Sequence, residues 1–200
     1  MTARPTLDVS RLPAYAFGPR GLLWWGTMGI VAIEGMMFAI FIATYFYLRM
    51  YVAQWSPDLP PPDLLYGTLN TLILLVSAVP NQWVKNAAER KDLRTVRIGL
   101  LICLVFAAAF LVIRAFEFMA LHCRWDTNAY GSAVWTLLGF HTFHLVTDAL
   151  DTAVLTVLMF TRQIEGTRFV DVSENAVYWY FVVGVWLPVY AVIYFAPRLL

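Results

Sequence analysis

Five long apolar stretches dominate this sequence and constrain its fold more than any other feature. They cover about residues 22–48, 64–84, 97–121, 131–160 and 176–196. About 20 mostly apolar residues are enough for a helix to cross the hydrocarbon core of a bilayer, and each stretch meets that length. Backbone polar groups in lipid must be satisfied within their own segment, which favours helices. We therefore predict an all-α polytopic transmembrane bundle with about five membrane-spanning helices.

The composition agrees with a membrane protein and excludes other classes. Charged residues make up 14% of the chain, well below the roughly 25% of soluble domains. The formal net charge is only +1, which argues against a nucleic-acid partner, because binding a phosphate backbone needs a dense basic surface. Cys103 and Cys123 are predicted at opposite ends of one helix, about 30 Å apart, so they cannot pair with each other.

The chain divides into a short tail and one predicted domain. Residues 1–21 contain three prolines and three arginines without an apolar core, so they are predicted to form a polar N-terminal tail rather than a cleavable signal. Residues 22–200 are predicted to form a single five-helix transmembrane domain. Prolines and charges mark loops at 56–63, 86–97, 122–130 and 162–175.

Basic residues predict the orientation of the bundle. Ten Lys and Arg residues lie on the side of the N-terminus and three on the other side. The ten are Arg4, Arg11, Arg20, Lys85, Arg90, Lys91, Arg94, Arg97, Arg162 and Arg168, and the three are Arg49, Arg124 and Arg198. The positive-inside rule therefore places the N-terminus in the cytoplasm and the C-terminus on the periplasmic side.

Ionisable side chains within the predicted spans are the candidate functional residues, because each is expensive at membrane depth. They are Glu34, Arg114, Glu117, His141, His144, Asp148 and Asp151. With a rise of about 1.5 Å per residue, the glutamate of the first span and both histidines are expected to meet near the midplane. Arg114 and Glu117 are expected about 5–10 Å from the outer surface, and both aspartates are expected close to the cytoplasmic surface.

Local spacing separates two kinds of site. Arg114 and Glu117 stand at i,i+3, which predicts a structural ion pair within one helix. Glu34 has two interpretations, a carboxyl group bonded to a neighbouring helix or a proton-handling site.

The fourth predicted helix carries His141, His144, Asp148 and Asp151 at a 3-4-3 spacing, which places them in one arc facing protein or water. A metal site is not expected, because Asp151 lies about 15 Å along the axis from His141. The Glu-x-x-His pattern of di-iron bundles and a CxxCH haem motif are both absent from the sequence. We predict hydrogen-bonded histidines, and aspartates that either handle protons or pair with nearby arginines. No catalytic, cofactor-binding or metal-binding residue is assigned.

The order of the motifs from Trp24 onward resembles subunit III of the haem–copper terminal oxidases, the cytochrome c oxidases. The segment AIEGMMFAIFIATYFYLR has Glu34 where the family has a buried Glu, and NTLILLVS matches an NT-x-x-LL-x-S helix. Glu117-Phe118 matches an EY-type motif. YGSAVWTLLGFHTFHLV is similar to the family's YGS…TGFHGLHV, and YWYFVVGVW to its YWHFVDVVW. The chain looks like the short, five-helix form.

Four residues depart from the family pattern. Tyr180 stands where the family has His, and Val183 where it has Asp. Asp148 and Asp151 add charge where glycine and apolar residues are expected. Either this protein does without the function of that His and Asp, or the two aspartates substitute for them; the departures are those expected of a divergent branch of the family.

The resemblance implies a non-catalytic subunit of a proton-translocating respiratory cytochrome c oxidase in a bacterial inner (plasma) membrane. Such a subunit supports proton uptake by stabilising subunit I and bound phospholipid. Its partners are subunits I and II, which hold the haem and copper, membrane lipids, and cytochrome c or a supercomplex partner through the complex. Two alternatives remain open: an accessory protein of a nitric oxide reductase, or a small independent transporter, for which inverted repeats would be expected.

Overall fold

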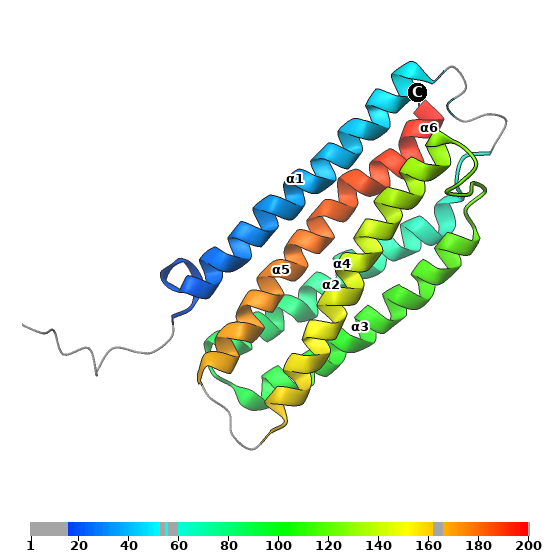
Figure 1. Cartoon of the computed structure of the whole chain (residues 1–200). Helices are drawn as coiled ribbons and strands as arrows, with labels where there is room; N and C mark the ends of the chain where they lie inside the picture. Colours follow the sequence, from blue (N-terminus) through cyan, green and yellow to red (C-terminus); the bar gives the residue numbers. More distant parts are fainter. Residues whose placement is uncertain (1–15, 53–54, 56–59, 162–165, 200) are drawn as a thin grey trace, which may run out of the picture.

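The described part of the chain contains five long helices, each apolar and long enough to cross a membrane (Figure 1). They are α1 (Leu22–Tyr51), α2 (Leu64–Glu89), α3 (Leu93–Met119), α4 (Ala129–Met159) and α5 (Gly166–Tyr190). A 3-10 turn, η1 (Gly18–Arg20), precedes them, and a π-helical segment, η2 (Ala191–Phe195), and α6 (Ala196–Leu199) continue the last helix.

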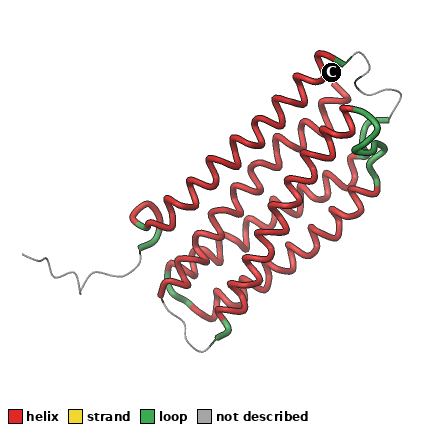
Figure 2. Tube along the Cα trace, viewed as in Figure 1, coloured by secondary structure: helices red, strands yellow, loops and turns green. Residues whose placement is uncertain are grey.

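The computed structural model describes residues 16–52, 55, 60–161 and 166–199. Within these ranges the chain contains helices and loops but no strands (Figure 2). The predicted all-α bundle with five potential spans is confirmed. Most of the predicted polar tail, including Arg4 and Arg11, lies outside the described residues, as do Arg162 and part of the predicted loop at 56–63.

The predicted loop at 162–175 was largely wrong, because residues 166–175 form the first turns of α5. The charged residues of this segment favour a loop when they are considered alone. Phe169 and Val172 nevertheless repeat at helical spacing and are buried against α2, α3 and α4, while Asp171 and Asn175 line a groove on another side of the helix. The predicted loop at 86–97 likewise shrinks to residues 90–92.

Polar caps explain where three helices begin. The side chain of Asp63 accepts a hydrogen bond from the Leu65 N–H at the start of α2. Asp92 and Asn128 act in the same way at the starts of α3 and α4. Each cap satisfies one of the backbone donors that a helix start leaves without an intrahelical partner. Hydrogen bonds from Thr95 also lower the pKa of Asp92.

The packing places α5 at the centre and α1 at the edge. α5 packs against α1, α2 and α4, whereas α2 and α3 form a close pair (Figure 1). α1 packs mainly against α4 and α5. Only 6% of the residues in its 18-residue apolar segment are buried within the bundle. α1 is therefore the most exposed of the five long helices, and the candidate site lies where it meets α4 and α5.

Candidate functional site

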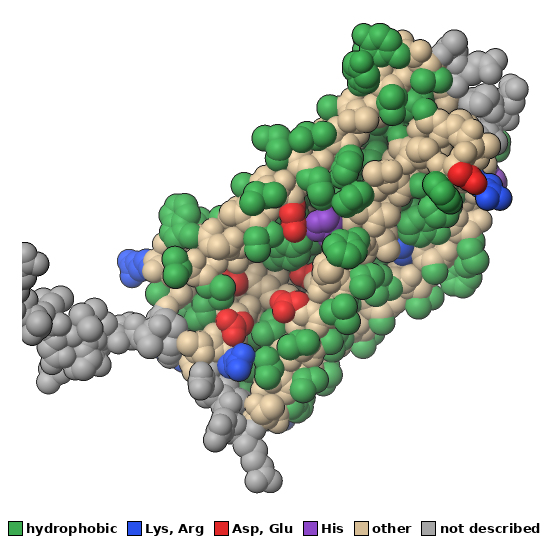
Figure 3. Space-filling view, viewed as in Figure 1, with side chains coloured by type: hydrophobic (Ala, Val, Ile, Leu, Met, Phe, Trp, Pro, Cys, Tyr) green, Lys and Arg blue, Asp and Glu red, His purple; other side chains and the backbone are tan. Residues whose placement is uncertain are grey.

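An open groove of about 600 Å³ lies between α1, α4 and α5. Five acidic residues line it: Glu34, Asp148, Asp151, Asp171 and Glu174. Among the described residues that line it, Arg168 is the single basic one, and its Nη1 lies 3.8 Å from a carboxylate oxygen of Asp171. Acidic side chains gather along this hollow in Figure 3. The groove therefore carries an excess of carboxyl groups between apolar helices.

Glu34, His144 and Tyr178 form a cluster at one end of the groove. The Tyr178 hydroxyl donates to Glu34 Oε2 at 2.6 Å. His144 Nδ1 lies 2.7 Å from the Phe140 carbonyl oxygen, and because a carbonyl only accepts, this nitrogen carries a proton. His144 Nε2 then faces Glu34 Oε2 at 3.5 Å. The carboxyl and imidazole groups can therefore share one proton, either as an ion pair or as two neutral groups.

His141 belongs to a different cluster, so the expectation that both histidines meet Glu34 was wrong for this residue. Its Nε2 lies 3.1 Å from the Val182 carbonyl oxygen and its Nδ1 lies 3.2 Å from Arg114 Nη2. The carbonyl requires a donor and the guanidinium requires an acceptor. His141 is therefore a neutral imidazole with its proton on Nε2.

The Arg114–Glu117 ion pair is at the centre of that second cluster. Arg114 Nη1 lies 2.9 Å from Glu117 Oε2, and each side chain is only 1% exposed. Asn70 and Tyr194 also donate hydrogen bonds to the Glu117 carboxylate. The Trp186 ring lies 4.1 Å from the guanidinium carbon, a distance at which a cation is attracted to the ring face. The buried charge is thus neutralised and enclosed within the bundle.

Among the described residues, the side chain that bonds both Asp148 and Asp151 is the amide of Asn175. Asn175 Nδ2 lies 3.1 Å from Asp151 Oδ2 and 3.5 Å from Asp148 Oδ1, and its own oxygen accepts from Thr152 at 3.2 Å. Arg97, an arginine at the same end of the bundle, donates to the Met159 carbonyl oxygen at 2.7 Å.

The buried histidines of the described residues are poorly placed to bind a metal ion. Both ring nitrogens of His141 and one of His144 are already engaged in protein hydrogen bonds. The described ranges contain no group of three or more His, Cys, Asp or Glu side chains placed to hold a metal. Cys103 and Cys123 are free thiols.

Four lining residues were missed from the sequence; Asp171, Glu174 and Asn175 lie in the predicted loop at 162–175, and Tyr178 lies in the predicted fifth span. Asp171, Glu174, Asn175 and Tyr178 follow i, i+3, i+4 and i+7, the spacing of one helix face. Phe169 opens the apolar face of the same segment. This periodicity is the signal that could have found them.

Comparison with known proteins agrees with the motifs. The family model for cytochrome c oxidase subunit III matches residues 17–197. Cytochrome c oxidase subunit 3 of Thermostichus vulcanus is 27% identical over 176 residues, covering 86% of this chain and 87% of that protein. The probable cytochrome c oxidase subunit 3 of Mycobacterium bovis is 33% identical over 178 residues, covering 85% and 86%. The relative from Corynebacterium diphtheriae is 29% identical over 176 residues, covering 85% and 86%. The chain therefore belongs to the cytochrome c oxidase subunit III family.

Proposed function

We propose that this chain is the non-catalytic subunit III of a respiratory haem–copper cytochrome c oxidase in a bacterial plasma membrane. The match of the family model over residues 17–197 carries this proposal. In such a complex, subunits I and II hold haem and copper, and this chain packs against them and stabilises subunit I. Cytochrome c or a supercomplex partner meets it only through the complex.

The groove gives this subunit two tasks, holding lipid and handling protons. Leu23, Ile30 and Val154 are among its apolar wall residues, which suit the acyl chain of a phospholipid. Its carboxyl groups and the adjacent His144 are chemical groups that exchange protons. We assign Asp151 and Asp148, followed by Glu34 with His144, to a route that supplies protons to the partner subunit. His141 belongs instead to the enclosed cluster and helps to hold Arg114 in place.

The orientation of the groove follows from the basic residues. The start of α1, the α2–α3 turn and the start of α5 share one end of the bundle (Figure 1), and Arg20 belongs to η1 directly before α1. Lys85, Arg94 and Arg168 belong to the segments at this end, which supports a cytoplasmic location. Asp151 and Asp171 then lie toward the cytoplasm, the side from which the oxidase takes protons. Reporter fusions at Arg94 and Leu200 are expected to label opposite sides of the membrane, and labelling of the same side would contradict this topology.

Purification through a tag on this chain tests the assignment. In mild detergent, we expect mass spectrometry to find oxidase subunits I and II, and a haem spectrum and copper analysis to find both cofactors in the complex. A partner with non-haem iron would instead indicate the nitric oxide reductase class. A chain that purifies without a haem-containing partner would point to the independent transporter.

A further inference from the structure

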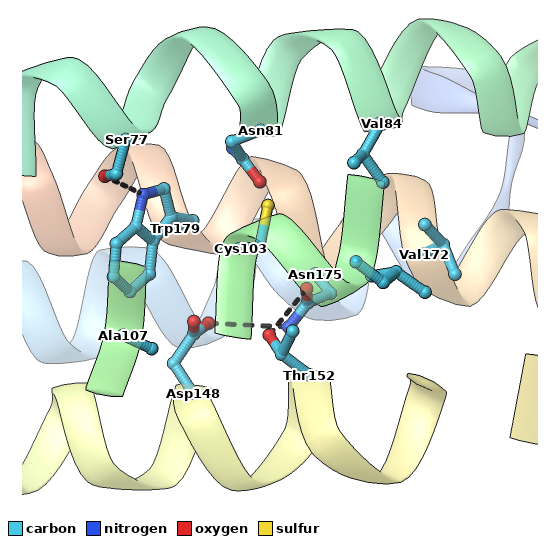
Figure 4. Close-up of a pocket in the computed structure, with 11 residues that line it drawn as sticks. Ser77, Asn81, Val84, Cys103, Ala107, Asp148, Thr152, Val172, Asn175 and Trp179 are labelled. Atoms are coloured by element: carbon cyan, nitrogen blue, oxygen red, sulfur yellow. Dashed lines mark hydrogen bonds between the residues drawn. The ribbon is translucent and has the colours of Figure 1, made fainter. Parts of the chain in front are cut away.

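A small polar cavity lies inside the bundle, beside the groove, with walls from α2, α3, α4 and α5 (Figure 4). Its volume is about 20 Å³. Its polar lining comes from Ser77, Asn81, Cys103, Asp148, Thr152 and Asn175. A cavity of this kind needs roughly 10–15 Å³ and two to four polar partners to bind one water molecule. Both its volume and its lining meet these needs.

Asp148 is the side chain in this lining that most needs a further partner. It is only 4% exposed, and the hydrogen bond that it accepts from Asn175 is long, at 3.5 Å. The same amide group lies closer to Asp151, at 3.1 Å. A carboxyl group this deeply buried is destabilising unless it makes good hydrogen bonds. Figure 4 shows its oxygens directed toward Asn175 and the interior of the cavity.

Asp148 and Asn175 line both the cavity and the open groove. These two side chains therefore form the wall between the two spaces. The hydrogen bond between Asn175 and Asp148, at 3.5 Å, is longer than those that join Asn175 to Asp151 and to Thr152. We propose that the cavity binds one water molecule, which is hydrogen-bonded to Asp148 and exchanges with the groove through this wall. The proposal goes beyond the assigned function and holds whether or not the aspartates supply protons to the oxidase.

Hydroxyl-radical footprinting of the purified complex tests this site, because radicals formed from a bound water oxidise the side chains beside it. The helix α5 offers a matched pair of indoles. Trp179 lines the cavity and donates to Ser77 Oγ, whereas Trp186 is fully buried and donates to Thr71 Oγ1. We expect oxidation of Trp179 to be several-fold faster than that of Trp186. Equal rates for the two indoles would overturn the proposal.

Two alanines on α3 supply a matched pair of variants. Ala107 lines the cavity, and its neighbour Ala108 is exposed on the surface of the bundle. Ala107→Val is expected to fill the cavity and to bring the oxidation of Trp179 down to the rate of Trp186. Ala108→Val should leave the difference unchanged. Rapid oxidation of Trp179 that persists in an assembled Ala107→Val complex would also overturn the proposal.

Two further measurements keep the test decisive. If Ala107→Val does not assemble, Thr152→Val removes a lining hydroxyl at similar volume and is expected to slow the oxidation of Trp179; an unchanged rate counts against the site. Mixing into ¹⁸O-water before irradiation tests the exchange. We expect ¹⁸O on oxidised Trp179, and incorporation of ¹⁶O alone would contradict exchange through the wall.

Discussion

The bundle contains two groups of buried charged residues that differ in how their charge is balanced. In the enclosed cluster between α3, α4 and α5, Arg114 and Glu117 neutralise each other, and His141 bonds Arg114 as a neutral ring. In the groove, Glu34, Asp148, Asp151, Asp171 and Glu174 outnumber the single Arg168. The first group is sealed inside helices, whereas the second opens between them.

This difference shows that the residue type alone does not determine the role of a charge in a membrane. An enclosed and neutralised pair is suited to holding helices together, because each side chain is only 1% exposed. Carboxyl groups along an open groove can exchange protons or bind cations. Glu174 is one of these groove residues, and its Oε2 has no hydrogen-bond partner in the described parts of the chain.

The largest expected effect comes from breaking the enclosed pair. Arg114→Leu leaves Glu117 buried without its cation, which should destabilise the protein by about 3–5 kcal/mol. We expect loss of assembled complex or a sharply lower unfolding temperature. The double change Arg114→Leu with Glu117→Leu should recover much of this stability, because hydrophobic replacement of a buried pair is often tolerated. A single variant as stable as the wild type would show that the pair is not structural.

A smaller loss is expected from crowding the same cluster. A Cβ at Gly67 would clash with the ring of Tyr194. The hydroxyl of this tyrosine donates a hydrogen bond to the Glu117 carboxylate. Gly67→Ala must displace that ring and should cost about 1–3 kcal/mol. Gly184 is the matched control, since a Cβ there meets no atom within 4 Å among the described residues. Thermal unfolding of the two variants in detergent measures the difference, and equal stability would contradict the close approach.

The groove is expected to affect turnover more than stability. Asp148→Asn with Asp151→Asn removes two proton-exchanging groups but keeps their size. Oxygen consumption should slow several-fold at alkaline pH, where protons are scarce, and change little at acidic pH. Asp126→Asn, in an exposed loop beside Arg124, is the control.

The outcome separates the two roles left open for these aspartates. Unchanged alkaline turnover in a fully assembled complex would end the proton-supply proposal. Weaker retention of this subunit at every pH would instead show that the aspartates hold α4 against α5 through Asn175.

The smallest effect is expected at the tyrosine that supports Glu34. Tyr178→Phe removes one hydrogen bond to the carboxyl group, which should cost about 1 kcal/mol. Tyr180→Phe is a natural comparison, because this hydroxyl bonds the exposed Gln82 at 2.6 Å. A chemical-denaturation series that ranks Tyr180→Phe as the more damaging change would show that the Glu34 cluster contributes little to stability.

The sequence by itself determined the five spans and the Arg114–Glu117 pair. Both depend on one helix at a time, through the length of an apolar segment or an i,i+3 spacing. The ordered motifs also identified the family before any contact was known. The prediction of a loop at 166–175 from its charged residues was wrong. These charges lie on the side of α5 that lines the groove.

Only the tertiary structure decided which polar groups meet. Tyr178 reaches Glu34 across 144 positions in the sequence, and Asn175 reaches Asp151 across 24. His141 and His144 are one helical turn apart, yet the first faces Arg114 and the second faces Glu34. The angle and rotation at which α1, α3 and α5 pack around α4 fix these partners. Those quantities come from side-chain packing between helices, which the periodicity of a single segment does not encode.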